Sequence, residues 1–324
     1  MSKNYLPQVN IIAACFNSAQ YLPDMIESVL SQDYQRVELF IQDGGSTDGS
    51  IDILRRYPIQ WASEPDNGIS QALNRAINAT QGEIILITGT DDLLQPGAIT
   101  AAVEIFKRRP KTVMVYGDCY IMDFKGEVLE LWKSRPFDLD WLFWEDYIPT
   151  QTAYVRRQAI CELGGFDESL KLVQDWDMWF RLGARFPAEC FEYIPRVQGC
   201  YRRYYNSAGM GNLQESAKCI VKVMAKFFDD PANVTPLRKG KKKAMAGGLV
   251  NLSANYSFAR QRLFAWKSYI QAVQIYPRLL FMRKGILALP LLIAGAKLWR
   301  LHKRVEEVRG LAKFGGLQND RVSK

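Results

Sequence analysis

The first 120 residues alternate short apolar runs with amphipathic segments, and this alternation constrains the fold more than any other feature. Apolar runs of strand length lie at 9–14, 37–41, 83–88 and 113–118, and apolar residues recur with helical spacing between them. Nearly continuous apolar runs are typical of parallel strands that are covered on both faces. The alternation predicts an α/β fold with a doubly wound, mostly parallel sheet.

Acidic residues follow two of these predicted strands directly. Asp43 comes after 37–41, and Asp91 and Asp92 come after 83–88. In open α/β sheets, ligands bind in the crevice outside the carboxyl ends of the strands. We therefore expect the three carboxylates to line a ligand site. A structural interpretation stays open, because Ser, Thr and Asp residues in such loops also cap the helices that follow.

Composition limits the chemistry further. At 324 residues and 48% hydrophobic content, the chain can bury a large core. Six scattered cysteines without a CxxC pair, and no signal peptide before the first strand, favour reduced thiols in the cytoplasm and argue against zinc. The single histidine, His302, lies in a basic region near the end, so a general base in the body should be a carboxylate.

Charge is distributed unevenly along the chain. Residues 239–313 hold 16 Lys and Arg against two Glu, a net +14, whereas the remainder holds 26 basic and 32 acidic residues, a net −6. A basic segment suits nucleic acid or an anionic membrane, and no nucleic-acid recognition motif accompanies it, so we expect no nucleic-acid partner. The polar stretch "DDPANVTPLRKGKKK" predicts a domain boundary near residue 236.

The longest uncharged apolar run in the basic segment is "GILALPLLIAGA", residues 285–296. It is too short to span a bilayer, and it contains Pro290. Basic residues flank it on both sides, which favours peripheral attachment to an anionic membrane surface. We expect a protein of the cytoplasmic membrane face; a helix packed on the first domain is the alternative.

Three motifs occur in order between Val9 and Arg203: "DGGSTDGS", "PDNGISQALNRAINATQGEIILITGTDD" and "GGFDESLKLVQDWDMWFRL". Together they resemble glycosyltransferase family 2, whose catalytic domain has the GT-A fold. The resemblance implies a GT-A catalytic domain at 1–235, with a nucleotide-binding half at about 1–120 and an acceptor half at about 121–235, followed by a basic helical extension at 236–324.

The activity that the resemblance implies is inverting sugar transfer by a single displacement. The donor would be a UDP-, GDP- or dTDP-sugar, and the acceptor a hydroxyl of a glycan or a lipid-linked molecule. A diphosphate leaving group gains negative charge as the glycosidic bond breaks, and a hard divalent cation neutralises it. Mn²⁺ or Mg²⁺ is therefore the expected cofactor.

By the same resemblance, Asp92 ligates the metal and Asp91 lies against the ribose or metal-bound water. Asp43 contacts the nucleobase, and Ala13 and Asn17 fall where the family touches the nucleoside.

The helix led by "NGISQALN" is expected to contact the donor through Gly68, Gln71 and Asn74, because exposed N–H groups at a helix start favour an anionic ligand. Many relatives have an aspartate where this chain has Gln71. In "QDWD", Asp175 matches the base that deprotonates the acceptor, and Asp177 should point elsewhere. Helix capping by Asp175 is the structural alternative.

Two further groups have open interpretations. Trp141, Trp144 and Tyr147 either stack on sugar rings or pack under a loop. Arg202 or Arg203 either reaches the diphosphate or faces solvent.

Two other functions compete with sugar transfer. A nucleotidyltransferase also uses an acidic metal site, but "ACFNSAQY" lacks the glycine-rich, Lys- or Arg-bearing loop of that class. A catalytically silent nucleotide-binding scaffold is disfavoured because Asp92 and Asp175 are both present.

Overall fold

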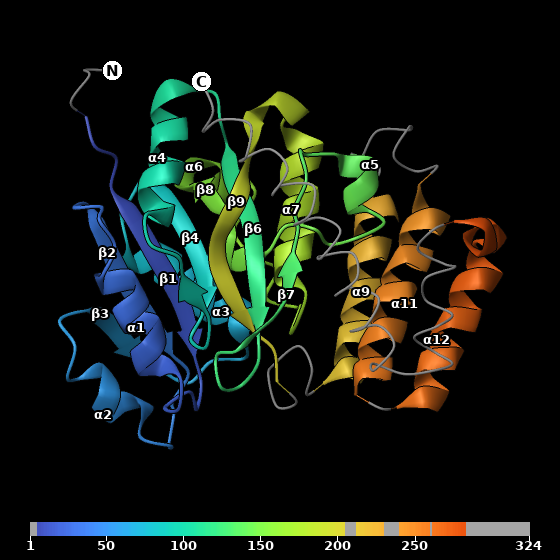
Figure 1. The fold of residues 1–324 in the computed structure, drawn as a ribbon, viewed down its shortest axis with the longest axis horizontal. Coiled ribbons are helices and arrows are strands. Elements are labelled where there is room, and N and C mark those ends of the chain that lie inside the picture. The colour runs from blue at the N-terminus through green and yellow to red at the C-terminus, as the bar shows by residue number, and fades with distance from the viewer. Residues whose placement is uncertain (1–4, 205–211, 230–239, 260, 283–324) are drawn as a thin grey trace, which may run out of the picture. The chain divides into compact units, whose positions relative to one another are not determined.

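The computed structural model describes residues 5–204, 212–229, 240–259 and 261–282 (Figure 1). The chain forms two compact units, 1–241 and 242–324, and each is described by itself.

The first unit is built on a nine-stranded sheet with the order β3-β2-β1-β4-β8-β6-β9-β5, and β7 pairs with β6. The strands are β1 (Val9–Cys15), β2 (Val37–Asp43), β3 (Gln60–Ser63), β4 (Ile84–Gly89), β5 (Leu93–Leu94), β6 (Met114–Met122), β7 (Val128–Trp132), β8 (Tyr154–Arg156) and β9 (Phe191–Arg202). The α-helices are α1 (Leu22–Leu30), α2 (Ser50–Leu54), α3 (Ile69–Ala79), α4 (Ala98–Arg108), α5 (Leu139–Leu142), α6 (Arg157–Glu162), α7 (Gln174–Arg185) and α9 (Leu213–Asp229). Two 3-10 turns are η1 (Thr150–Thr152) and η2 (Ala188–Cys190).

Strand β1 lies between β2 and β4 and runs parallel to both. Its register pairs Ala14 with Gly89 of β4, and Cys15 with Asp43 of β2. The loops that follow the three strands therefore leave the sheet side by side, at the point where the strand order reverses. This is where doubly wound sheets bind ligands.

Successive side chains of β1 point to opposite faces of the sheet, and both faces are covered by other parts of the protein. Val9, Ile11 and Ala13 join the apolar residues of α1 and α4 in one buried cluster. The sequence predicts an apolar stripe of five residues on α1; Leu22, Met25, Ile26 and Val29 are buried as expected, but Leu30 is 46% exposed. Figure 1 shows α1 on the near face of the sheet. Each large side chain of this kind contributes about 1.5–3 kcal/mol when it is buried.

The second half of the sheet departs from simple βα alternation. Antiparallel β8 lies between β4 and β6, and the 12-residue strand β9 runs parallel to β6. Sequence analysis did not predict β9, which carries Pro195 and several charged residues. Its register shifts around Gly117, where a Cβ atom would lie 2.9 Å from the carbonyl oxygen of Arg196. The close approach explains why a glycine stands there.

Two helix starts differ from the sequence-based expectation. Ser70 is of a residue type that often caps helices, so the sequence predicts it as the cap of α3. The helix instead begins at Ile69 with Gly68 as its N-cap, and the Ser70 hydroxyl donates to the Leu170 carbonyl. Helix α7 begins at Gln174 with Val173 as its N-cap. Asp175 therefore lies in the first turn, and its interpretation as the N-cap is wrong.

The described part of the second unit contains α11 (Lys241–Phe258), α12 (Arg262–Ile275) and η3 (Pro277–Phe281). The Ser253 hydroxyl donates to the Ala265 carbonyl at 2.8 Å and ties α11 to α12. None of the helices in the described ranges is long and apolar enough to cross a membrane. Residues 285–296 and His302 lie outside those ranges.

Candidate active site

The loops after β1 and β2 are held together by Asn17. Its backbone adopts a left-handed conformation with φ 51°, which Asn tolerates better than most residues. The Asn17 amide donates to the Ser46 hydroxyl at 2.8 Å, and the Asn17 side-chain oxygen accepts from the Thr47 amide at 2.9 Å. Asn17 thus fixes the predicted nucleoside end of the site.

Asp43 is fully buried and organises its own loop. Its carboxylate accepts hydrogen bonds from the amides of Gly45 at 2.9 Å and Ser46 at 3.0 Å, and from the hydroxyls of Ser46 and Ser63. Burial alone would raise the pKa of Asp43, but the hydrogen bonds from Ser46 and Ser63 outweigh it and lower the pKa below its ordinary value. The carboxylate is therefore held ionised.

Ala13 is fully buried in β1, between Ile41 of β2 and Thr88 of β4. It therefore lies in the core of the sheet, on the strand between β2 and β4, the two strands whose ends carry the acidic loops.

Asp91 and Asp92 lie in the turn that follows β4. One oxygen of Asp92 accepts from the Arg202 amide at 2.9 Å, and the other from the Gly89 amide at 3.3 Å. Burial, followed by the charge of Asp91, raises the pKa of Asp92 well above its ordinary value. Burial also raises the pKa of Asp91, although a hydrogen bond with Tyr204 acts in the opposite direction. The two carboxylates therefore repel each other at a buried position that water hardly reaches.

Both carboxylates converge over Gly89. A Cβ atom on Gly89 would lie 2.7 Å from Asp91 Oδ1 and 2.8 Å from Asp92 Oδ2. In the described ranges, no cluster of three or more His, Cys, Asp or Glu residues forms a metal site. Mg²⁺-like cations are often bound through one or two carboxylates plus substrate phosphates and water, so this pair fits such a cation.

Arg202 supports the Asp91–Asp92 turn from the end of β9. Its side chain is only 3% exposed, and its Nε donates to the Asp91 carbonyl at 2.9 Å. Its other nitrogens donate to the Phe124 carbonyl at 3.3 Å and to the Asp24 carboxylate at 3.3 Å. Arg203 pairs with Glu130 at 2.7 Å. The solvent interpretation is therefore wrong for Arg202, whose partners in the structure are protein groups.

The Asp175 carboxylate accepts from the Thr150 hydroxyl and from the Trp176 amide. Thr150 belongs to η1, which packs against β4, β6 and β9. The next residue, Gln151, donates to the Cys119 sulfur on β6 at 3.0 Å. The turn η1 thus connects Asp175 to the strands that carry the Asp91–Asp92 turn and Arg202.

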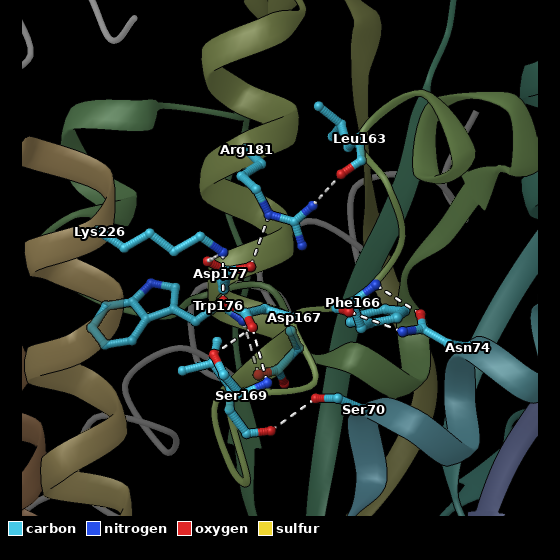
Figure 2. Close-up of polar contacts among 12 residues, drawn as sticks. Ser70, Asn74, Leu163, Phe166, Asp167, Ser169, Trp176, Asp177, Arg181 and Lys226 are labelled. Carbon is cyan, nitrogen blue, oxygen red and sulfur yellow. Dashed lines mark hydrogen bonds and ion pairs between the residues drawn. The ribbon is translucent and has the colours of Figure 1, made fainter. Parts of the chain in front are cut away.

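Asp177 has a different set of partners from Asp175, as expected from their spacing. It is 3% exposed, and its carboxylate accepts from Arg181 Nε at 2.8 Å and from Lys226 Nζ at 3.2 Å (Figure 2). Lys226 also pairs with Asp167 at 2.7 Å.

Gln71 and Asn74 are used to hold the loop before α7. The Asn74 amide donates to the Phe166 carbonyl at 2.9 Å, and its oxygen accepts from the Phe166 amide at 2.8 Å (Figure 2). Both side chains also donate to Glu168, Gln71 at 3.1 Å and Asn74 at 2.9 Å. Gly68 at the start of α3 donates its amide to Asp66 at 2.8 Å. The contacts of Gln71 and Asn74 could not be predicted from the sequence, because their partners lie more than 90 residues away along the chain.

The aromatic residues after β7 pack inside the protein. Trp144 and Tyr147 are buried, and the Arg135 guanidinium lies 4.0 Å from the centre of the Trp141 ring. For Trp144 and Tyr147 the packing interpretation is therefore correct.

The Asp167–Lys226 pair gives a testable pH dependence. Burial alone would raise the pKa of Asp167, but hydrogen bonds from Lys226 and Ser169 lower it below its ordinary value. A lowered pKa in the folded state stabilises the protein above the unfolded-state pKa of about 3.9, and the gain is lost as the pH falls through the folded-state pKa. Lys226 is 41% exposed, so solvent screening limits the gain to about 1 kcal/mol.

We expect Asp167→Asn to lower the free energy of unfolding by about 1 kcal/mol at pH 7 and by progressively less below pH 4, measured by urea unfolding. Asp52→Asn is the matched control, because its pair with Arg55 is 67% and 64% exposed. It should change stability little at either pH. An equal loss for Asp167→Asn at pH 7 and pH 3 would contradict the assignment.

Comparisons with known proteins agree with this geometry. A sequence profile described as "Glycosyl transferase family 2" matches residues 10–164. An uncharacterised glycosyltransferase of Rickettsia typhi is 30% identical over 188 residues, which cover 55% of this chain and 59% of that protein. A PGL/p-HBAD biosynthesis glycosyltransferase of Mycobacterium bovis is 28% identical over 206 residues, which cover 61% and 78%. The match thus spans less than two thirds of the Rickettsia typhi relative.

Solved structures share the fold. The mannosyltransferase PcManGT of Pyrobaculum calidifontis, solved with GDP-Man and Mn²⁺, superposes with a TM-score of 0.61 at 18% identity, over 94% of this chain and 88% of that one. TarS 1–349 of S. aureus superposes with a TM-score of 0.58 at 15% identity, over 98% and 93%. The predicted GT-A fold with helices at its C-terminal end is confirmed, and residues 10–164 form a domain that matches glycosyltransferase family 2.

Proposed function

We propose that this protein moves a sugar from a nucleotide-sugar to a hydroxyl of a glycan or lipid-linked acceptor, with inversion at the anomeric carbon. The observation that carries the proposal is the pair of carboxylates converging over Gly89, with η1 linking their strand to Asp175. A metal-binding pair and a separate carboxylate base are the two parts that such a displacement needs.

Asp91 and Asp92 would hold the divalent cation, Mn²⁺ or Mg²⁺. When bound, the cation neutralises the charge that develops on the diphosphate leaving group. Burial raises the pKa of both carboxylates, and the charge of Asp91 raises that of Asp92 further; a bound cation would favour their charged forms. The relative solved with GDP-Man and Mn²⁺ supports this cofactor.

Asp175 would be the general base. The acceptor oxygen forms a bond to the anomeric carbon, the bond from that carbon to the diphosphate breaks, and the acceptor proton moves to the Asp175 carboxylate. Hydrogen bonds from Thr150 and the Trp176 amide orient this carboxylate. No histidine is available in the described ranges, since His302 lies outside them.

The nucleoside would lie over the loops after β1 and β2, near Asn17 and Asp43, with Ala13 beneath it. GDP-Man and UDP-GlcNAc in structural neighbours support a nucleotide-sugar donor. Gly68 would contact the donor directly. We assign Gln71 and Asn74 an indirect role, because their side chains already bind the loop before α7.

Replacing the base tests the acid–base assignment. Asp175→Asn keeps the shape of the side chain but cannot take a proton, so the transfer rate should fall about 10²- to 10⁴-fold. Calorimetry should find nucleoside diphosphate affinity nearly unchanged. Asp177→Asn is the companion variant, and its effect on rate should be smaller. Near-normal turnover in Asp175→Asn, with loss in Asp177→Asn, would reverse the assignment.

Filling the space over Gly89 tests the metal site. In Gly89→Ala, the new Cβ displaces the carboxylate oxygens of Asp91 and Asp92, which it would otherwise approach to 2.7 and 2.8 Å. We expect Mn²⁺ to strengthen nucleoside diphosphate binding in the native protein, and EDTA or Gly89→Ala to abolish that increase, as measured by calorimetry. Equal affinity with Mn²⁺ and with EDTA in the native protein would exclude the metal role.

Hydrolysis of a nucleotide-sugar without acceptor distinguishes a transferase from a silent scaffold.

We also propose that the protein works on the cytoplasmic face of a membrane that contains anionic lipid. The helix α12 buries Ala265, Ser268, Tyr269 and Ala272 along one face. Leu263 and Ile270 share the opposite face and are 86% and 50% exposed, and Phe281 of η3 is 85% exposed. The described residues from 241 to 282 include six Lys and Arg and no Asp or Glu. Exposed apolar side chains with basic neighbours suit an anionic lipid surface.

Co-sedimentation with vesicles tests this surface. The native protein should bind vesicles containing phosphatidylglycerol, and binding should weaken in high salt. Leu263→Glu with Phe281→Glu should reduce binding at least tenfold, because each apolar side chain contributes about 1.5–3 kcal/mol on burial. Val221→Glu is the matched control, since Val221 is 46% exposed on α9 of the first unit. If it weakened binding equally, the α12 surface would be ruled out.

A further inference from the structure

The loop of residues 163–173, which precedes α7, is held from two sides (Figure 2). From α3, the Ser70 hydroxyl donates to the Leu170 carbonyl at 2.9 Å, and Asn74 binds both backbone groups of Phe166. From α9, Lys226 pairs with Asp167 at 2.7 Å. The loop therefore cannot move without breaking contacts to a helix on each side.

Lys226 joins this loop to α7 as well. Its ammonium group also pairs with Asp177, whose carboxylate is 4% exposed. Arg181 completes the cluster, with Nε donating to Asp177 at 2.8 Å and Nη1 donating to the Leu163 carbonyl at 3.0 Å. A buried carboxylate is costly unless it is paired, so removing one of its two cations loosens the attachment of α7.

The residue between these anchors adopts an unfavourable conformation. Val173 has φ 55°, and a β-branched residue with positive φ is a true outlier. Its carbonyl accepts from the Asp177 amide at 3.2 Å and so closes the first turn of α7, the turn that contains Asp175. Such conformations persist only where the surroundings enforce them. Two contacts enforce the conformation of Val173. One is made by Asp167, which precedes it in the chain, and the other by Asp177, which follows it.

We propose that Lys226 is a positioning residue for the Asp175 carboxylate. By bridging Asp167 and Asp177, it holds Val173 in the left-handed conformation and fixes the first turn of α7 against η1. Lys226 does not touch the reacting atoms. This inference rests on the proposed role of Asp175 as the base, and it assigns to α9 a part in the transfer step.

The test is Lys226→Met in the full-length protein, with donor and acceptor kinetics and calorimetry of nucleoside diphosphate binding. A misplacement of about 1 Å can reduce the rate about 10²-fold, so kcat should fall roughly 10- to 100-fold. The KM of the donor and the nucleotide affinity should stay within about twofold, because the donor contacts lie on other elements. Lys226→Arg, which keeps the charge, should restore most of kcat.

Lys218→Met is the matched control on the same helix, because Lys218 is 75% exposed and, within the described residues, pairs only with Glu215, at 3.2 Å. It should leave kcat unchanged. If Lys226→Met does not fold, Asp167→Asn supplies the second test: it breaks one end of the bridge while Lys226 keeps its pair with Asp177, so it should fold and should lower kcat without changing donor KM.

The outcomes separate the two proposals. Turnover retained by Asp175→Asn defeats the proposed function, whatever Lys226 does. If Asp175→Asn is inactive, the positioning role is overturned by a kcat in Lys226→Met equal to that of Lys218→Met, by an equal loss of donor affinity, or, where Lys226→Met does not fold, by an unchanged kcat in Asp167→Asn.

Discussion

The buried guanidinium of Arg202 is the interaction on which the candidate site depends. It connects the Asp91–Asp92 turn, the end of β9, the β6–β7 hairpin and Asp24 of α1, which are far apart in sequence. A buried cation is tolerated only when it is paired and hydrogen-bonded. Burial raises the pKa of Asp91 and Asp92, and the charge of Asp91 raises that of Asp92 further; the charge of Arg202 lowers both and so partly counters these effects. Two like charges are thereby kept together, ready for a divalent cation.

Local sequence patterns predicted the half of the fold that presents these carboxylates. The apolar runs that became β1, β2, β4 and β6 are recognisable without knowing their partners, because both faces of each strand are covered. Acidic residues directly after such runs must emerge at one edge of a parallel sheet. The positions of Asp43, Asp91 and Asp92 beside the carboxyl ends of the strands could therefore be predicted from the sequence alone.

The contacts that hold Asp175 could not be predicted in this way. Strand β9 contains Pro195 and charged residues, and its pairing with β6 joins segments about 77 residues apart, as in Met114 opposite Phe191. Asn74 was expected near the donor, but its partner Phe166 is 92 residues away in sequence. Only the folded arrangement reveals that α3 and α9 hold the loop before α7 from opposite sides. Spacing predicted that Asp175 and Asp177 point in different directions, but only the folded structure reveals the partners of each.

The most direct test of the proposed site is to locate the cation itself. Crystals grown with Mn²⁺ and a nucleoside diphosphate, measured near the manganese absorption edge, would reveal the ion as an anomalous peak. We predict a peak in contact with the Asp92 carboxylate and with phosphate oxygens, close to Asp91 and over Gly89. A nucleotide bound at the same strand ends without manganese, or a manganese peak away from both carboxylates, would contradict the proposed site.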